Sequence, residues 1–189
     1  MERIQVYFMS VKFDKTRMLK IEEIVKLFFK QNNIEVIIPV DVFELANSLG
    51  FDVRGAEFAE PLEGLLLVDE NILKIKGFNS NKVIAYNCQK NIYMKKFIVA
   101  HELAHYISEK NKNKKIVLAA RDHEGDYSNN EDEQEMDYMA ACILMPREDI
   151  LQNFEGKNNK RAELVNLIAS RYNVSSKMAE RRIEEVLNG

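Results

Sequence analysis

The feature that most constrains this chain is the sequence His-Glu-Leu-Ala-His at residues 101–105, which lies inside an apolar segment. Apolar residues recur at helical spacing from about residue 92 to residue 109, so this segment predicts a buried helix. Histidines four positions apart project from one face of a helix, and both imidazoles can therefore reach one metal ion. Glu102 lies beside them, where its carboxylate can contact a water rather than the metal.

Chance explains this pattern poorly. The chain has only three histidines among 189 residues, and two of them make the pattern. A chain of this composition matches it by chance roughly once in two hundred. A metal held by such a pair lowers the pKa of a bound water, and the neighbouring Glu102 can take the proton as that water attacks an amide carbonyl. The pattern thus predicts peptide-bond hydrolysis and disfavours the alternative of two solvated histidines on an ordinary amphipathic helix.

A third protein ligand is expected in the acidic stretch of residues 121–137, because zinc sites of this kind use three protein ligands and leave one position for water. The favoured ligand is Glu133. Asp137 follows four positions later on the same helical face and can hold a ligand histidine by its other ring nitrogen. Glu135 is the reserve ligand. The remaining candidates fit a solvated loop or a helix N-terminus better, and they are His123, Glu124, Asp126, Glu131 and Asp132.

Two imidazoles and one carboxylate form a donor set that favours zinc (Zn2+), with Mn2+ and Fe2+ as weaker candidates. A peptidase also needs a hydrogen-bond donor for the negative charge that develops on the attacked carbonyl oxygen. Tyrosine hydroxyls are candidates for that role, and the sequence selects none of the four concerned: Tyr93, Tyr106, Tyr127 and Tyr138.

The remaining pattern predicts a helix-rich α+β fold. Short apolar runs at residues 65–68, 72–75 and 83–86, separated by turn residues, predict a small antiparallel three-stranded sheet. Alternating apolar residues favour a short strand in an N-terminal extension, residues 1–17. Further helices are expected at residues 18–32, 41–49, 130–145, 160–172 and 176–187, the last two forming a C-terminal tail.

Composition and the N-terminal sequence indicate the class of the protein and its cellular compartment. The net charge is −3, whereas nucleic-acid-binding proteins usually carry an excess of positive charge. Hydrophobic residues make up 46% of the chain, enough for one globular core. Two cysteines are too few for a disulfide framework and favour a reducing compartment. The N-terminus has no signal-peptide pattern, and no apolar run reaches the roughly 18 residues of a membrane span. The sequence therefore predicts a cytoplasmic chain with no membrane anchor.

A second motif follows the histidines by about thirty residues and reads E-x-x-M-D-x-M-A-A-x-I-L-M-P over residues 133–146. Together the two motifs resemble the ImmA/IrrE family of zinc metallopeptidases, whose second motif reads approximately E-x-x-A-N-x-F-A-A-x-L-L-M-P. The segment of residues 39–50 also resembles that family's N-terminal helix. The resemblance implies a zincin-like metallopeptidase domain over residues 18–146, with residues 147–189 as a helical extension packed on it.

Position by position, the resemblance implies that His101 and His105 bind zinc, that Glu102 is the general base and that Glu133 is the third ligand. Asp137 stands where the family usually has asparagine. Aspartate can still orient an imidazole, so the exchange keeps the expected site intact.

The resemblance also implies a partner, since such peptidases typically cleave a helix-turn-helix transcriptional repressor of a mobile element, prophage or stress regulon that is encoded nearby. Two other functions fit the same residues. A regulatory module could keep the fold and metal yet only sequester its partner, as the departures at Met136 and Asp137 suggest. A toxin-like protease acting within its own operon would share the chemistry and differ in substrate.

The tail, residues 161–187, has the shape of a helix–turn–helix, with Arg181 and Arg182 on its second helix. Residues 147–189 contain eight basic and seven acidic residues, an excess too small for a DNA-binding surface. The sequence therefore disfavours direct DNA binding and favours a tail that packs on the domain or docks the substrate. The oligomeric state has no signature in the sequence.

Overall fold

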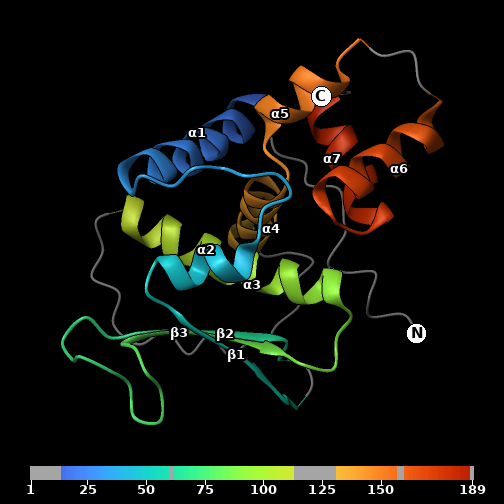
Figure 1. Ribbon diagram of the computed structural model, residues 1–189. Coiled ribbons are helices and arrows are strands. Elements are labelled where there is room, and N and C mark those ends of the chain that lie inside the picture. The colour runs from blue at the N-terminus through green and yellow to red at the C-terminus, as the bar shows by residue number, and fades with distance from the viewer. Residues whose placement is uncertain (1–13, 60–61, 113–130, 157–159, 188–189) are drawn as a thin grey trace. The chain divides into compact units, whose positions relative to one another are not determined.

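The structure is a computed structural model that describes residues 14–59, 62–112, 131–156 and 160–187. Within these residues it contains seven helices and three strands, which confirms the predicted helix-rich α+β class (Figure 1). The chain divides into two compact units. We call residues 41–126 the sheet unit, and residues 1–40 with residues 127–189 the helical unit. Residues 1–13, where a short strand is expected, lie outside the described residues.

The sheet unit is built on a mixed sheet of three strands, β1 (Asp52–Ala56), β2 (Gly64–Val68) and β3 (Lys82–Asn87). The strand order is β1-β3-β2, with β3 parallel to β1 and antiparallel to β2. The prediction of an all-antiparallel sheet is therefore wrong. The apolar strand β3 takes the central place, where both neighbouring strands cover its edges, and four of its six residues are buried.

The strand expected at residues 72–75 is absent, and β1 takes its place in the sheet. Residues 69–81 form turns instead, with the Ile75 amide donating to the Ser80 carbonyl at 2.8 Å. Leu73, in the middle of this apolar run, is 97% exposed and therefore does not pack in the core. The strand β1 has no clear alternation of buried and exposed residues, which left it without a sequence signal.

Helix α2 (Val42–Ser48) lies within the range that the sequence predicts. The Asp41 carboxylate caps it by accepting hydrogen bonds from the backbone amides of Phe43 and Glu44, at 3.1 and 3.2 Å. Gly50 follows with a φ of +86°, a left-handed conformation that favours glycine at a helix end.

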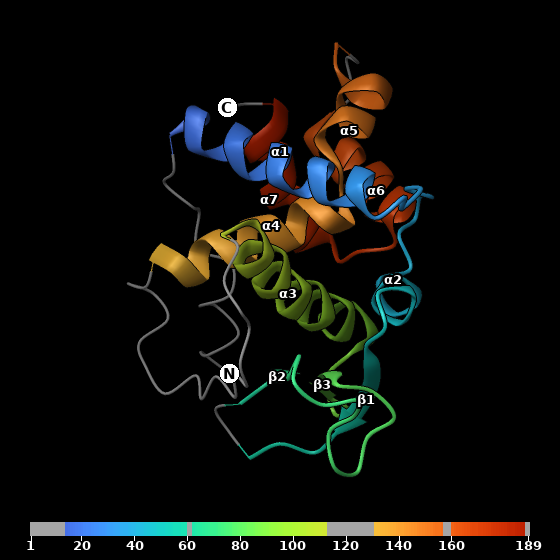
Figure 2. The ribbon, with the colours of Figure 1, turned by 90° about the vertical axis from the view of Figure 1, so that its left-hand side faces the viewer.

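Helix α3 (Ile92–Asn111) carries the histidine motif and lies with α2 on one face of the sheet (Figures 1 and 2). It packs against α2, β2 and β3. Every residue from 97 to 108 is buried, so the middle of the helix has no solvent-facing stripe. The Asn91 side chain caps its first turn by accepting from the Met94 amide at 3.0 Å.

The helical unit contains the other five helices, and its core begins with α1 packed along α4. The buried face of α1 consists of Ile21, Val25 and Phe29, at helical spacing. Helix α7 contacts both α5 and α6. The bounds of the five helices are α1 (Lys15–Gln31), α4 (Glu131–Leu144), α5 (Arg147–Phe154), α6 (Arg161–Tyr172) and α7 (Ser176–Leu187).

Helix α5 is an element that the sequence did not predict. Pro146 ends α4, as expected from its missing amide hydrogen, but its φ of −58° also suits the start of a new helix. Ile150 and Phe154, one turn apart, are both buried and hold α5 in the core of the helical unit. Among all the helices described, none has the length and hydrophobicity needed to cross a membrane.

Candidate metal centre

The histidine motif places three functional groups on the buried middle of α3. His101, Glu102 and His105 are 7%, 2% and 2% exposed. The Nε2 atoms of the two histidines lie 3.0 Å apart, and the rings stand edge to face with centroids 4.7 Å apart. The structure thus brings the two imidazoles together on one side of the helix, as their spacing predicts.

This geometry fits two ligands of one metal ion. Two nitrogens bound at tetrahedral angles to the same zinc ion lie roughly 3.3 Å apart. The 3.0 Å separation of the Nε2 atoms of His101 and His105 is close to that value. Neutral imidazole nitrogens are ordinary zinc donors, so both the spacing and the chemistry of this pair suit the metal.

The Glu102 carboxylate lies against the backbone of β2. A Cβ atom built on Gly64, the first residue of that strand, would stand 2.6 Å from Glu102 Oε1. The absence of a side chain at Gly64 is therefore what gives the carboxylate its room. Sequence analysis did not select Gly64, although an isolated glycine in a strand often marks a close approach of this kind.

The acidic candidates belong to α4 in the helical unit. Glu133 and Asp137 are both half-buried and stand one turn apart on that helix, as predicted. The reserve ligand Glu135 accepts a hydrogen bond from Arg17 Nε of α1. An ion pair within the helical unit thus already engages Glu135. Residues 113–130, which include the candidates His123, Glu124 and Asp126, lie outside the described part of the chain.

The first turn of α4 begins with Glu131 and Asp132, which are both exposed. Glu131 lies 3.6 Å from Arg17 in an ion pair. Acidic side chains in the first turn complement the positive end of the helix dipole, which is the structural role expected for these two residues.

Two of the four tyrosine candidates use their hydroxyls elsewhere. The Tyr106 hydroxyl accepts from Lys82 Nζ at 3.3 Å, and the Tyr138 hydroxyl donates to the Glu22 carboxylate. Burial of Tyr138 raises the pKa of its phenol above the ordinary value, so the hydroxyl stays protonated. Tyr93 is exposed at the start of α3, and Tyr127 lies outside the described residues.

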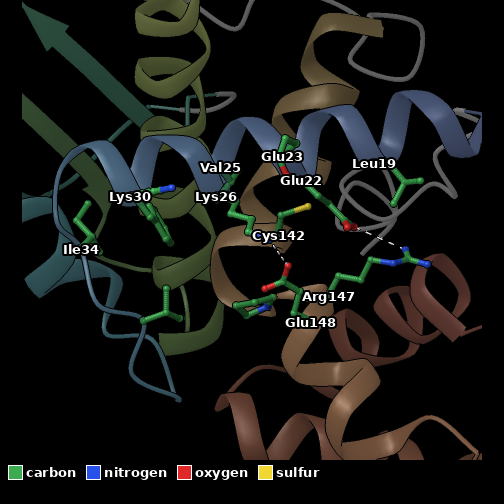
Figure 3. Close-up of a pocket in the computed structure, with 13 residues that line it drawn as sticks. Leu19, Glu22, Glu23, Val25, Lys26, Lys30, Ile34, Cys142, Arg147 and Glu148 are labelled. Carbon is green, nitrogen blue, oxygen red and sulfur yellow. Dashed lines mark hydrogen bonds and ion pairs between the residues drawn. The ribbon is translucent and has the colours of Figure 1, made fainter.

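A separate cavity of about 410 Å³ lies in the helical unit, between α1, α4 and α5 (Figure 3). Lys26 and Glu148 form an ion pair beside it, and Arg147 lies 3.8 Å from Glu22. None of the lining residues in the described part of the chain is a histidine. Its lining residues are Leu19, Glu22, Glu23, Val25, Lys26, Phe29, Lys30, Ile34, Val36, Cys142, Pro146, Arg147 and Glu148.

The two tail arginines pack inside the helical unit instead of lying on its surface. Arg182 is completely buried, and Arg181 donates to the Glu185 carboxylate at 2.8 Å. Ser175 caps the helix that carries them by accepting from the Met178 amide at 3.3 Å. The structure therefore gives both arginines a packing role.

Comparisons with known proteins identify a family and a similar fold for this chain. The family model for the IrrE N-terminal-like domain, Peptidase_M78, matches residues 46–184, a range that includes α3 and α4. A solved structure described as a Mycobacterium tuberculosis transcriptional regulator shares the fold, with 14% sequence identity and a TM-score of 0.51. The match covers 89% of this chain and 49% of that one, so the chain spans about half of its length. No curated protein sequence matches. The chain belongs to the Peptidase_M78 family, whose domain is of the metallopeptidase type.

Proposed function

We propose that this chain is a zinc-dependent endopeptidase whose substrate is a helix-turn-helix transcriptional repressor encoded nearby. The observation that carries the proposal is the pair of Nε2 atoms of His101 and His105, 3.0 Å apart on a buried helix. Glu102, whose carboxylate belongs to a residue type that is rarely buried, is 2% exposed and stands beside them. Membership of a peptidase family supports peptide hydrolysis as the reaction.

In this proposal His101, His105 and Glu133 hold the zinc, and Asp137 orients one of the imidazoles. The two histidines come from the buried middle of α3, and Glu133 comes from the first turn of α4. Two histidines and one glutamate are a donor set that zinc peptidases use. Glu133 is preferred to Glu135 because Arg17 already engages the Glu135 carboxylate.

The chemistry then depends on Glu102. Zinc, when bound, supplies a Lewis acid that polarises the scissile carbonyl and makes water a stronger nucleophile. The Glu102 carboxylate accepts a proton from the attacking water and passes it to the amide nitrogen as the carbon–nitrogen bond breaks. Its burial and its contact with β2 hold the carboxylate in one place and keep bulk water from it.

The choice of a repressor as substrate is supported by the paired motifs and by the transcriptional regulator that shares the fold. Such a substrate places the reaction inside the cell. We assign residues 18–146 to the peptidase domain, and we give residues 147–189 the role of an extension that packs on this domain or docks the substrate.

The test is cleavage of the transcriptional regulator encoded beside the gene, followed by gel electrophoresis and mass spectrometry of the products. We expect the zinc-loaded chain to cut it at a defined site. Glu102→Gln should keep its zinc and lower the cleavage rate by about 10²- to 10⁴-fold. Glu109→Gln, on the same helix two turns further on, is the matched control and should cut at the wild-type rate.

Two results would contradict the proposal. A regulator that binds stoichiometrically and is recovered intact would identify the chain as a module that sequesters its partner. A Glu102→Gln variant that cuts at the wild-type rate would remove Glu102 from the reaction. If the neighbouring gene encodes a small antitoxin, and that protein is cut instead, the chain is a toxin-like protease with the same chemistry.

A further inference from the structure

Gly64 makes an unusually close approach to α3. A Cβ atom at this position would stand 2.6 Å from Glu102 Oε1 and 2.6 Å from Ile98 Cγ2. Real Cβ atoms essentially never come within 3.0 Å of a heavy atom that lies outside their own residue and its two chain neighbours. Gly64 does not have a positive φ, so backbone conformation does not require a glycine there. The requirement comes only from the side chains of α3.

A second glycine in the sheet, Gly55, provides a comparison for Gly64. Gly55 in β1 and Gly64 in β2 pair with the same residue of the central strand, Tyr86. A Cβ at Gly55 would meet Cys88 Cβ at 3.1 Å and the Tyr86 ring at 3.4 Å. These contacts are tight but lie beyond the 3.0 Å limit, and none involves α3. The two glycines therefore differ in their approach to α3, where Gly64 alone comes close to Glu102 and Ile98.

We infer that Gly64 is a positioning residue for Glu102. Its missing side chain lets the backbone of β2 form one wall of the space that holds the carboxylate. The opposite end of the Glu102 side chain is fixed by the buried helix α3, so the carboxylate is confined between helix and strand. Any larger residue at position 64 must displace the Glu102 carboxylate, the Ile98 side chain or the strand itself.

This inference deepens the proposed function and depends on it for the catalytic consequence. A general base acts only from the position at which it can reach its proton, and a displacement of about 1 Å can cost a factor of 10² in rate. Gly64→Ala should therefore lower kcat by about 10- to 100-fold, with KM within about twofold and zinc content unchanged. Gly55→Ala is the matched control and should leave kcat, KM and zinc content at wild-type values.

The contact itself is tested without activity, by a double-mutant cycle on the folding equilibrium constant from urea unfolding. Gly64→Ala should lower this constant roughly tenfold more in the wild-type background than in Glu102→Ala, because the methyl group collides with the carboxylate. Gly55→Ala and Glu102→Ala should be additive. If Gly64→Ala does not fold, the same cycle is run in the Ile98→Ala background, where the other close contact is gone.

A spectroscopic readout follows the carboxylate directly. In protein labelled with ¹³C at the glutamate carboxylates, the Glu102 resonance is assigned by its loss in Glu102→Gln. We expect it to move in Gly64→Ala and to stay in place in Gly55→Ala. An unmoved resonance together with an additive cycle would overturn the inference while leaving Glu102 as the base. A Glu102→Gln variant with full activity would instead overturn the proposed function and leave the contact measurable.

Discussion

Arg182 of α7 donates a hydrogen bond from its guanidinium to the Glu22 carboxylate of α1, at 3.1 Å, across 160 positions of sequence. The same buried group donates to the Met145 carbonyl at 3.0 Å and to Glu185 at 3.3 Å. Its central carbon lies 5.3 Å from the centre of the Tyr138 ring. One side chain thus joins α1, α4 and α7 in the helical unit.

Truncation of this arginine should destabilise the protein strongly. Arg182→Ala leaves the half-buried carboxylate of Glu22 and the buried carboxylate of Glu185 without their shared cation, and removing one partner of a buried ion pair costs about 3–5 kcal/mol of unfolding free energy. Chemical denaturation measures this loss. The control is Arg161→Ala, whose exposed ion pair with Glu184 should contribute almost nothing. A loss of unfolding free energy in Arg182→Ala as small as the loss in Arg161→Ala would show that the buried network does not stabilise the fold.

Zinc content separates Glu133 from its neighbour Glu135. Glu133→Ala and His105→Ala should each lose most of the zinc that the wild-type chain retains after dialysis, because each removes a proposed ligand. Glu135→Ala removes only one of the two carboxylates that pair with Arg17 and should keep about one zinc per chain. Elemental analysis of the purified variants measures the difference. Loss of zinc in Glu135→Ala but not in Glu133→Ala would exchange their roles.

Asp137 should act through an imidazole rather than on the metal. Asp137→Ala is expected to weaken zinc binding by about 10- to 100-fold, as usual when a partner of a ligand histidine is removed. Asp137→Asn should bind zinc almost as well as the wild-type chain, since an amide oxygen can accept the same hydrogen bond. Competition titration against a zinc chelator gives both affinities. A loss of similar size in Asp137→Asn would mean that the charge, not the hydrogen bond, is required.

Acid should weaken the helical unit through Asp149. Hydrogen bonds from the Arg171 guanidinium, both at 2.7 Å, together with one from the Tyr172 hydroxyl, hold the pKa of the Asp149 carboxyl below its ordinary value. A pKa that is lower in the folded state contributes stability above the unfolded pKa of about 3.9, and this contribution disappears as pH falls through the folded value.

The corresponding variant is Asp149→Asn. It should be less stable than the wild type at pH 7, and the difference should shrink as pH falls from about 5 toward 2. Urea unfolding midpoints measured across this range check the prediction. Glu155→Gln, at the exposed end of α5, is the control and should follow the wild-type curve. A difference that stays constant with pH would exclude Asp149 as the titrating group.

The two cysteines should differ sharply in reactivity. Burial raises the pKa of the Cys142 thiol to about 12, whereas Cys88 is exposed. At pH 8 the native protein should therefore release one equivalent of chromophore from a disulfide reagent at once, and a second only on unfolding. Native Cys88→Ser should release none. Fast reaction of Cys142 in the native protein would show that its surroundings open readily.

Local sequence determined much of the proposed centre. The spacing of His101 and His105 fixes their common face on any helix, and the Asp41 cap and Gly50 bound α2 by interactions within a few residues. Two short motifs were enough to indicate the family, because within each motif the proposed ligands and the helix-packing residues lie close together along the chain.

Tertiary structure alone decided the rest. The apolar run at residues 72–75 has the composition of a strand, yet β1 pairs with β3, because pairing depends on which segment reaches the sheet edge and not on its own pattern. Whether Arg182 lies on a surface or in a core depends on helices far away in sequence. The room for Glu102 likewise depends on Gly64, 38 positions earlier, since a close contact between strand and helix arises only when both are packed.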